Sequence, residues 1–234
     1  MKHAQRYIMI FFVIAAVVTA MILLPQVAQP AMRTPKGTIV IDAGHGGFDG
    51  GASGKSGIHE DGLNLAVAQK LEALFEKNGY IVIMTRETGE AIGDTKDKDM
   101  AARRKIIAEA KADIVISIHM NKFSDTSVCG PQVFYHEDSA EGEKFAKLIQ
   151  QELNTALEPP KDRIEHPEDY FILCSGDSPA VIVECGFLSN EREEALLQDD
   201  TYQMECAKAI YRGADAYLDQ RVQSEDTGDF HYPL

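Results

Sequence analysis

Short apolar runs alternate with longer amphipathic segments along most of this chain. The runs are apolar throughout and bounded by polar or turn-forming residues, which is typical of buried strands. The amphipathic segments repeat apolar residues every three or four positions, as one face of a helix does. The predicted strands are residues 38–41, 80–84, 114–118, 132–135, 170–174 and 179–184. The predicted helices are residues 63–77, 100–111, 141–157 and 201–218, and Asn78-Gly79 is predicted to stop the first of them. The predicted loops include residues 88–99 and 158–169.

This order of elements predicts an α/β fold. Strands that are apolar on both sides belong to a mostly parallel sheet with helices on both faces. The chain shows no internal repeat and no second domain, so we expect a single catalytic domain over residues 37–220. Residues 29–36 are predicted to be a linker, and residues 221–234 a polar, mobile tail. In sheets of this kind ligands bind beyond the carboxyl ends of the strands.

The first 28 residues differ from the rest of the chain. Lys2, His3 and Arg6 precede an apolar run over residues 7–24, close to the roughly 20 residues that span a bilayer. Basic residues before such a run place the start of the chain in the cytoplasm and the rest outside it. Residues 1–28 are therefore predicted to be a membrane anchor or a cleavable signal peptide. Either form exports the protein, anchored to or secreted on the outer side of the cytoplasmic membrane.

Composition narrows the classes of partner. The formal charge of −14 is spread over all 234 residues, and no basic stripe of the kind that binds nucleic acid is present. Apolar residues make up 44% of the chain, enough for a core without a disulfide scaffold. The cysteines fit no zinc ribbon and no CxxC pair, so we expect buried or unpaired thiols at Cys129, Cys174, Cys185 and Cys206.

Three predicted strands end near residues suited to metal or proton chemistry. His45 follows the first strand, His119 follows the third, and Glu184 closes the last. Glu60 stands before the first long helix, after a glycine-rich loop that can fold it back towards His45. Imidazole nitrogen and carboxylate oxygen hold zinc well, and a catalytic zinc takes three protein ligands and leaves a position for water. A His-Glu-His ligand set is thus available, although three scattered residues are a weak signal by spacing alone.

Each of these residues also has a structural interpretation. His45 could cap a loop, and His119 could be a hydrogen-bonded core histidine. Glu60 could be a charge favoured at a helix N-terminus, with His59 as the substitute ligand. Glu184 could be structural. The glycine-rich loop lacks the GxxxxGK[ST] and GxGxxG patterns of phosphate-binding loops, which argues against nucleotide binding.

Four segments carry a resemblance to a known family. In chain order they are IDAGHGGFDGGASG, GIHEDGLNLAVAQKL, ADIVISIHMN and PAVIVECGFLSN. In order and separation they resemble the signature segments of the zinc-dependent N-acetylmuramoyl-L-alanine amidases, the type 3 amidase family, which has an α/β catalytic domain. The resemblance covers residues 37–218. It implies hydrolysis of the amide bond between N-acetylmuramic acid and L-alanine in peptidoglycan.

The resemblance also assigns residues. It places His45, Glu60 and His119 at the ligand positions of one Zn²⁺ per chain, and Glu184 at the position of the catalytic glutamate. A zinc-activated hydroxide would attack the lactyl carbonyl, and Glu184 would carry a proton to the departing alanine amine. Further family positions, expected to bind substrate, are Asn121, Arg86 and Arg104. The chain departs from the family with Asp-Ala for Asp-Pro and SIHMN for SIHAN, which bears on substrate fit and removes no ligand.

A narrower resemblance is to the germination-specific branch of that family in endospore formers. The chain is similar to it in IVIMTRE and in the layout KLIQQEL…VIVECGFLSN…EALL, and it has no wall-binding repeats and no long helix inserted before Glu184. This implies removal of stem peptides for muramic-δ-lactam formation in spore cortex, in the forespore intermembrane space. Without a plugging helix, control is left to something else, such as an activating partner protein.

Two other classes of function stay open at this point. One is a different zinc-dependent peptidoglycan hydrolase, either a peptidase or a deacetylase. The other is a non-catalytic peptidoglycan-binding module, which is disfavoured because both histidines and Glu184 are present.

Overall fold

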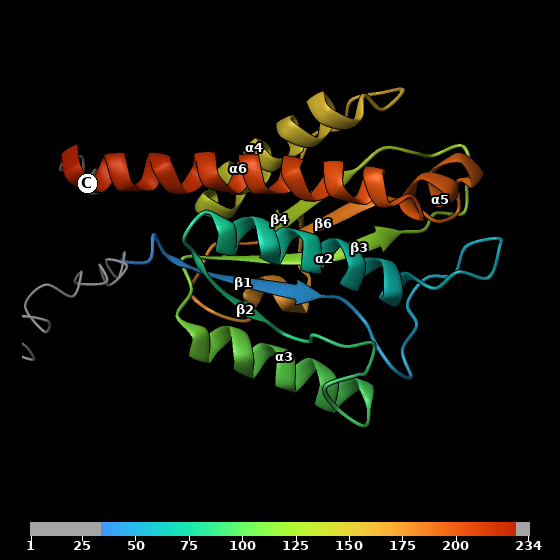
Figure 1. The fold of residues 1–234 in the computed structure, drawn as a ribbon, viewed down its shortest axis with the longest axis horizontal. Coiled ribbons are helices and arrows are strands. Elements are labelled where there is room, and N and C mark those ends of the chain that lie inside the picture. Colours follow the sequence, from blue (N-terminus) through green and yellow to red (C-terminus); the bar gives the residue numbers. More distant parts are fainter. Residues whose placement is uncertain (1–33, 228–234) are drawn as a thin grey trace, which may run out of the picture. The chain divides into compact units, whose positions relative to one another are not determined.

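A six-stranded sheet runs through residues 34–227, the part of the chain that the computed structural model describes. Its strand order is β2-β1-β3-β6-β4-β5 (Figure 1). The strands are β1 (Thr38–Ala43), β2 (Ile81–Met84), β3 (Ile114–Asn121), β4 (Gln132–His136), β5 (His166–Glu168) and β6 (Ala180–Phe187). Only the β4–β6 pair is antiparallel, and the other neighbouring pairs are parallel. The predicted mostly parallel sheet is confirmed.

Helices cover both faces of the sheet, as predicted. On one face lie α2 (Glu60–Lys77), α4 (Ala140–Leu157) and α6 (Asp200–Thr227), and on the other lie α3 (Lys96–Ala110) and the 3₁₀ helix η1 (Phe171–Cys174). The strands supply both cores, because successive side chains point to opposite faces. In β1, for example, Ile39 and Ile41 join the core under α2 and α6, whereas Val40 joins the core under α3.

Local sequence sets the ends of two helices. α2 ends where predicted, at Asn78, and Gly79 follows with a φ of 89°, a conformation that glycine adopts without strain. α3 begins at Lys96, earlier than the predicted residue 100. The Thr95 side chain accepts a hydrogen bond from the backbone N–H of Lys98, and this N-cap extends the helix into the predicted loop.

Four expectations need correction. Residues 171–174 form the 3₁₀ helix η1 and no strand, because Ile172 and Leu173 face the core while Phe171 stays exposed. The predicted loop at 158–169 contains the short strand β5. A short helix, α5 (Glu191–Leu197), was not predicted. The last helix continues to Thr227, past its predicted end and into the expected tail, and Arg221 on this extension donates a hydrogen bond to the Asp113 carbonyl.

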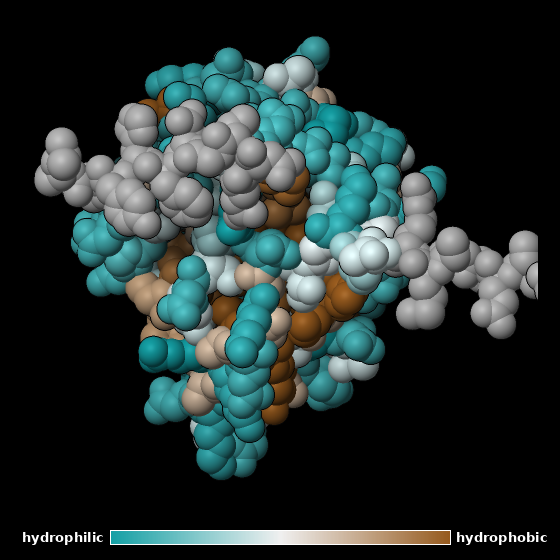
Figure 2. All heavy atoms as spheres, turned by 90° about the vertical axis from the view of Figure 1, so that its left-hand side faces the viewer, coloured by the Kyte–Doolittle hydropathy of each residue, from teal (hydrophilic) through white to brown (hydrophobic). Residues whose placement is uncertain are grey.

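The N-terminal expectations fall outside the described residues. This holds for the apolar run at residues 7–24 and for most of the predicted linker. Among residues 34–227, no helix is long and apolar enough to cross a membrane. The face at the amino ends of the parallel strands, turned to the viewer in Figure 2, carries mainly hydrophilic side chains with hydrophobic ones between them.

The contact between α4 and α6 yields the first prediction. A Cβ added at Gly213 would lie 2.6 Å from the Ile149 Cα, so the two helices would have to separate. We expect Gly213→Ala to lower the free energy of unfolding by about 1–3 kcal/mol, measured by denaturant titration. Gly62→Ala is the matched control, because a Cβ there meets nothing within 4 Å and alanine favours a helix by up to about 1 kcal/mol. Equal effects of the two changes would contradict this packing.

Candidate active site

A glycine-rich loop brings the first histidine and the glutamate together. His45 follows β1 with a φ of 61°, in the left-handed region, and Gly46 and Gly47 continue with φ of 133° and 58°. The loop then folds back, and the Glu60 N–H at the start of α2 donates to the Ala52 carbonyl. Hydrogen bonds to a residue distant in the sequence also hold the loop. Glu194 of α5 accepts hydrogen bonds from the Lys55 N–H, the Ser56 N–H and the Ser56 hydroxyl.

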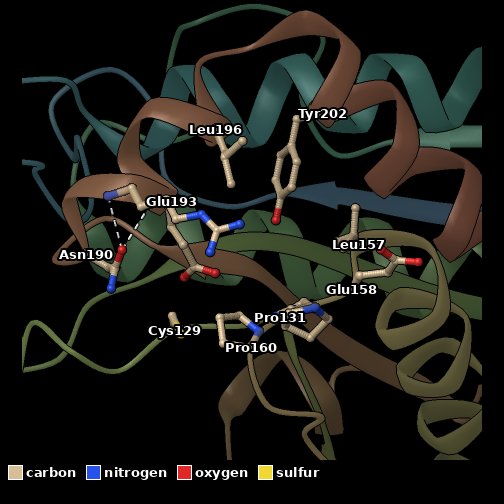
Figure 3. A pocket seen from close by; sticks show the side chains of 11 residues that line it. Cys129, Pro131, Leu157, Glu158, Pro160, Asn190, Glu193, Leu196 and Tyr202 are labelled. Carbon is tan, nitrogen blue, oxygen red and sulfur yellow. Dashed lines mark hydrogen bonds between the residues drawn. The ribbon is translucent and has the colours of Figure 1, made fainter.

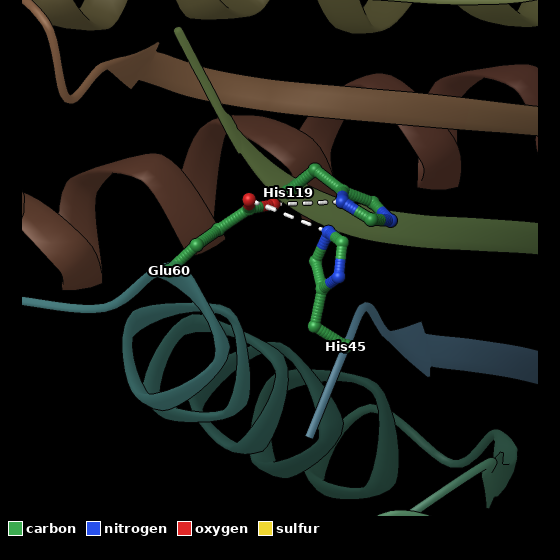
Figure 4. A group of neighbouring side chains, drawn as sticks. All are labelled: His45, Glu60 and His119. Carbon is green, nitrogen blue, oxygen red and sulfur yellow. Dashed lines mark hydrogen bonds and ion pairs between the residues drawn. The ribbon is translucent and has the colours of Figure 1, made fainter. Parts of the chain in front are cut away.

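The side chains of His45, Glu60 and His119 converge on one point near the carboxyl ends of β1 and β3 (Figure 4). His45 follows β1, but His119 lies within β3, which extends to Asn121 and past the predicted end of that strand. The Glu60 carboxylate contacts both rings, 2.8 Å from His119 Nδ1 and 3.4 Å from His45 Nε2, and the rings themselves lie edge to face with centroids 5.0 Å apart. The donor atoms of the three residues lie within 4.8 Å of one another. This chemical set, two imidazoles and one carboxylate, fits a zinc ion.

The Glu60 carboxylate is fixed by more than the histidines. It is only 4% exposed and accepts hydrogen bonds from the N–H groups of Ala52 and Met120 and from the Asn64 amide. Burial opposes its ionisation, but the hydrogen bonds with His119 and His45 outweigh burial and hold its pKa below the usual range. Glu60 is therefore held in its ionised form, which is the form of a carboxylate that binds a metal ion.

The Glu60 carboxylate changes the pKa of His45. Burial alone would lower the pKa of His45, but the hydrogen bonds and negative charges of Glu60 and Asp49 raise it to about 9. A metal ion would have to displace this proton, because only neutral imidazole binds a metal.

Glu184 faces this group from the neighbouring strand. The register of the sheet places it directly beside His119, β6 against β3. One of its carboxylate oxygens is buried and makes no hydrogen bond within the protein. Burial, which outweighs the opposing effect of His119, raises the pKa of Glu184 to about 7. Cys185 lies on the opposite face in the core, as expected from strand alternation, so of these two neighbours only Glu184 faces the candidate site.

These residues open into a cleft of about 420 Å³. His45, His119 and Glu184 line its polar side. Its apolar residues include Phe48, Met100, Tyr170, Phe171 and Ile182. Three of the aromatic side chains are substantially exposed, Phe48 by 57%, Phe171 by 47% and Tyr170 by 44%. The cleft thus combines a site for acid–base chemistry with an apolar wall.

The three expected substrate-binding residues lie in different environments. Arg104 is exposed on α3, with its guanidinium 5.3 Å from the centre of the Phe171 ring at the cleft wall. Asn121 ends β3, and its side chain accepts a hydrogen bond from the Lys122 N–H. Arg86 is buried, does not line the cleft, and donates to backbone carbonyls.

Sequence reasoning missed Arg103. It is 2% exposed and forms ion pairs with Asp42 at 2.7 Å and Asp99 at 2.6 Å. The sequence does contain a pattern that indicates the burial of Arg103. Asp99, Arg103 and the apolar Ile107 are spaced four positions apart in α3, so they share one face of the helix. This spacing places Arg103, and not its neighbour Arg104, on the face towards the sheet.

Two nearby alternatives do not compete with this site. His59, the substitute ligand, bonds to the Ser53 hydroxyl at 3.1 Å. A second group of possible metal donors consists of His136, Asp169 and Cys174. The His136 Nδ1 accepts a hydrogen bond from a backbone N–H, so the neutral ring carries its proton on Nε2, directed at Asp169 3.5 Å away. That arrangement suits a hydrogen bond better than a metal bond.

Another cavity, of about 180 Å³, lies near α5 and the start of α6 (Figure 3). Two of its polar side chains have partners within the protein. Glu193 accepts from the N–H groups of Gly130 and Phe187, and the Tyr202 hydroxyl donates to the Cys185 carbonyl. None of the four residues of the candidate site lines it, so it is a packing cavity. The described cysteines are free thiols, with Cys185 and Cys206 buried, as expected.

Comparison with known proteins supports the resemblance noted in the sequence. A family model described as N-acetylmuramoyl-L-alanine amidase matches residues 39–216. The germination-specific N-acetylmuramoyl-L-alanine amidase of Bacillus subtilis is 35% identical over 191 residues, 78% of this chain and 80% of that protein.

Solved structures agree. The CwlD amidase of Clostridioides difficile, solved in complex with the GerS lipoprotein, superposes with a TM-score of 0.75 and 37% identity, over 79% of this chain and 99% of that one. The catalytic domain of CwlV, an amidase of Bacillus (Paenibacillus) polymyxa, superposes with a TM-score of 0.71 and is 31% identical in sequence, over 78% of this chain and 98% of that one. The chain therefore belongs to the N-acetylmuramoyl-L-alanine amidase family and is a peptidoglycan amidase.

Proposed function

We propose that this amidase is zinc-dependent and that His45, Glu60 and His119 hold the metal while Glu184 moves the proton. The observation that carries the proposal is the convergence of the three donor side chains beside Glu184. The residues fit the metal: two imidazoles and a carboxylate are typical ligands of catalytic zinc, which leaves a fourth position for water. The family is itself generally zinc-dependent.

The chemistry divides between the metal and the chain. Zinc supplies Lewis acidity and lowers the pKa of water to roughly 7. The bond to be hydrolysed joins the lactyl carbonyl carbon to the alanine nitrogen, and water adds its oxygen to that carbon. Glu184 takes a proton from the attacking water and returns it to the alanine nitrogen, which leaves as an amine. In the metal-free site burial raises the pKa of Glu184 to about 7, and a group that titrates near neutral pH suits both transfers.

The aromatic side chains of the cleft wall orient the substrate. Phe48, Tyr170 and Phe171 present exposed aromatic surface beside the metal ligands. Apolar side chains there hold the substrate against the wall and displace water, which strengthens electrostatic interactions at the reacting bond. Arg104, stacked on Phe171, and Asn121 at the end of β3 are the groups we assign to contacts with polar parts of peptidoglycan.

We further propose a role in spore-cortex maturation, in which removal of stem peptides precedes muramic-δ-lactam formation. The similarity to the germination-specific amidase supports this role. We propose export through residues 1–28, as a membrane anchor or a signal peptide, with residues 29–36 as linker and 37–220 as catalytic domain. The complex of the similar CwlD with a lipoprotein supports an activating protein partner for this chain.

Product analysis tests the reaction. Purified peptidoglycan, digested with and without zinc, should release peptides that begin with alanine and leave intact glycan chains. Mass spectrometry of both fractions provides the measurement. Release of shortened peptides would indicate a peptidase, loss of acetyl groups a deacetylase, and binding without any product a non-catalytic module.

Metal content tests the ligand set. The wild-type protein should bind about one zinc per chain, and His45→Ala and His119→Ala should each lose most of it, because each removes one of three ligands. Mass spectrometry of metals, normalised to protein, gives the stoichiometry. His166→Ala is the control, since His166 is exposed and outside the site. Full zinc retention in both ligand variants would rule out the assignment.

A comparison of two glutamates separates binding from chemistry. Glu184→Gln keeps the side-chain shape but removes proton transfer, so zinc should stay bound while turnover falls by about 10²–10⁴ or more. Glu60→Gln removes a charged ligand and should weaken zinc binding as well as activity. Zinc content and peptide release are measured for both variants. Metal loss in Glu184→Gln with retention in Glu60→Gln would mean that the two roles are exchanged.

A further inference from the structure

We infer that Arg86 and Arg103 form a clamp, the arginine clamp, which holds the His45 loop in the conformation that metal binding requires. Both are then positioning residues of the site. The inference rests on the proposed zinc function and adds to it two residues that touch neither the metal ligands' side chains nor the reacting bond.

The His45 backbone needs such support. Its φ of 61° lies in the left-handed region, which is unfavourable for residues with a side chain. This conformation turns the chain sharply after β1 and directs the imidazole towards Glu60. A residue held in a sparsely populated conformation persists only where the surrounding structure determines it.

The clamp fixes three successive carbonyl groups at this point. The Ala43 carbonyl accepts from Arg86 Nε at 2.8 Å and from Arg103 Nη1 at 2.7 Å. The Gly44 carbonyl accepts from Arg86 Nη2 at 2.9 Å, and the His45 carbonyl accepts from Arg103 Nη2 at 2.5 Å. Planar guanidinium groups present their donors in a fixed fork, so these bonds define the orientation of the loop as well as its position.

Arg86 also links the two halves of the ligand set. Its Nη2 donates both to the Gly44 carbonyl and to the Asp61 carbonyl, at 2.9 Å and 2.8 Å. Gly44 precedes His45 and Asp61 follows Glu60 in the chain. One nitrogen atom thus ties the loop that carries the histidine to the first turn of the helix that carries the glutamate.

The clamp is itself fixed. Arg103 pairs with Asp42 and Asp99, and Arg86 Nη1 donates to the Thr88 carbonyl. Asp42 is held in turn by hydroxyl groups, those of Ser117 at 2.6 Å and Thr85 at 2.7 Å. Arg86 and Arg103 are only 5% and 2% exposed to solvent. Arg86 does not line the cleft, whereas Arg103 lines it next to His45. The guanidinium hydrogen bonds of both residues are directed at the protein, as a positioning role requires.

Zinc affinity is the direct test. Metal-free wild type, Arg103→Met, Arg103→Lys, Arg86→Met and Arg86→Lys are titrated with zinc against a chromophoric chelator. We expect affinity to fall about 10- to 100-fold in the methionine variants, the usual effect of losing support behind metal ligands. The lysine variants should be intermediate, because an ammonium group can replace some of the lost bonds. Lys105→Ala is the control, since Lys105 is exposed on the same helix and pairs only with Glu109 at 3.9 Å.

Two further measurements separate positioning from general stability. Thermal unfolding of the metal-free proteins shows which variants are folded, and the visible spectrum of the cobalt-substituted proteins reports ligand geometry. A changed spectrum in a folded variant with weakened affinity supports the clamp. Wild-type affinity and spectrum in folded Arg103→Met and Arg86→Met would overturn it, as would a raised KM with unchanged zinc affinity. Where a methionine variant does not fold, its lysine counterpart is judged by the same criteria.

The wild-type measurement keeps this inference distinct from the proposed function. A wild-type protein that binds no zinc contradicts the zinc site and the clamp together. A wild-type protein that binds zinc, with variants that keep its affinity, contradicts the clamp alone.

Discussion

The Glu60 carboxylate, held between His45 and His119, is the interaction on which the site depends. A buried carboxylate is costly unless it is hydrogen-bonded and paired, and Glu60 meets this condition with backbone N–H groups as well as the two rings. The parallel sheet makes the arrangement possible, because β1 and β3 end side by side. The helix N-terminus that starts at Glu60 also favours a negative charge there.

Behind the ligands, the protein uses charge for support and not only for chemistry. Asp42 and Arg103 form a buried ion pair at 2.7 Å beneath the cleft. Such a pair contributes little net stability when compared with apolar side chains of the same volume, so stability alone does not account for it. Its donors and acceptors instead connect β1, α3 and the His45 loop.

The sequence predicted most of the sheet because apolar runs are a strong local pattern, and it was the four family-like segments together that pointed to the residues which the structure brings close to one another. Apolar runs identified most of the strands, and the carboxyl-end rule pointed to His45, His119 and Glu184. Neither α5 nor β5 was predicted from the sequence, because both are short. The Asn190 side chain caps α5, and β5 is held by pairing with β4. Arg104 was expected from the family resemblance, and Arg103 was not considered, although the helix phase of Asp99, Arg103 and Ile107 places Arg103 on the face towards the sheet.

The hydrogen bonds between Glu194 and the Lys55–Ser56 segment have a consequence for biosynthesis. A chain grows from its amino end, so His45, Glu60 and His119 all exist long before Glu194 is added. Glu184 arrives late as well, and the last strand must insert between β3 and β4. A nascent or truncated chain therefore contains His45, Glu60 and His119 but lacks both the Glu194 hydrogen bonds and Glu184. The four residues of the candidate site can therefore come together only when nearly the whole domain has been made.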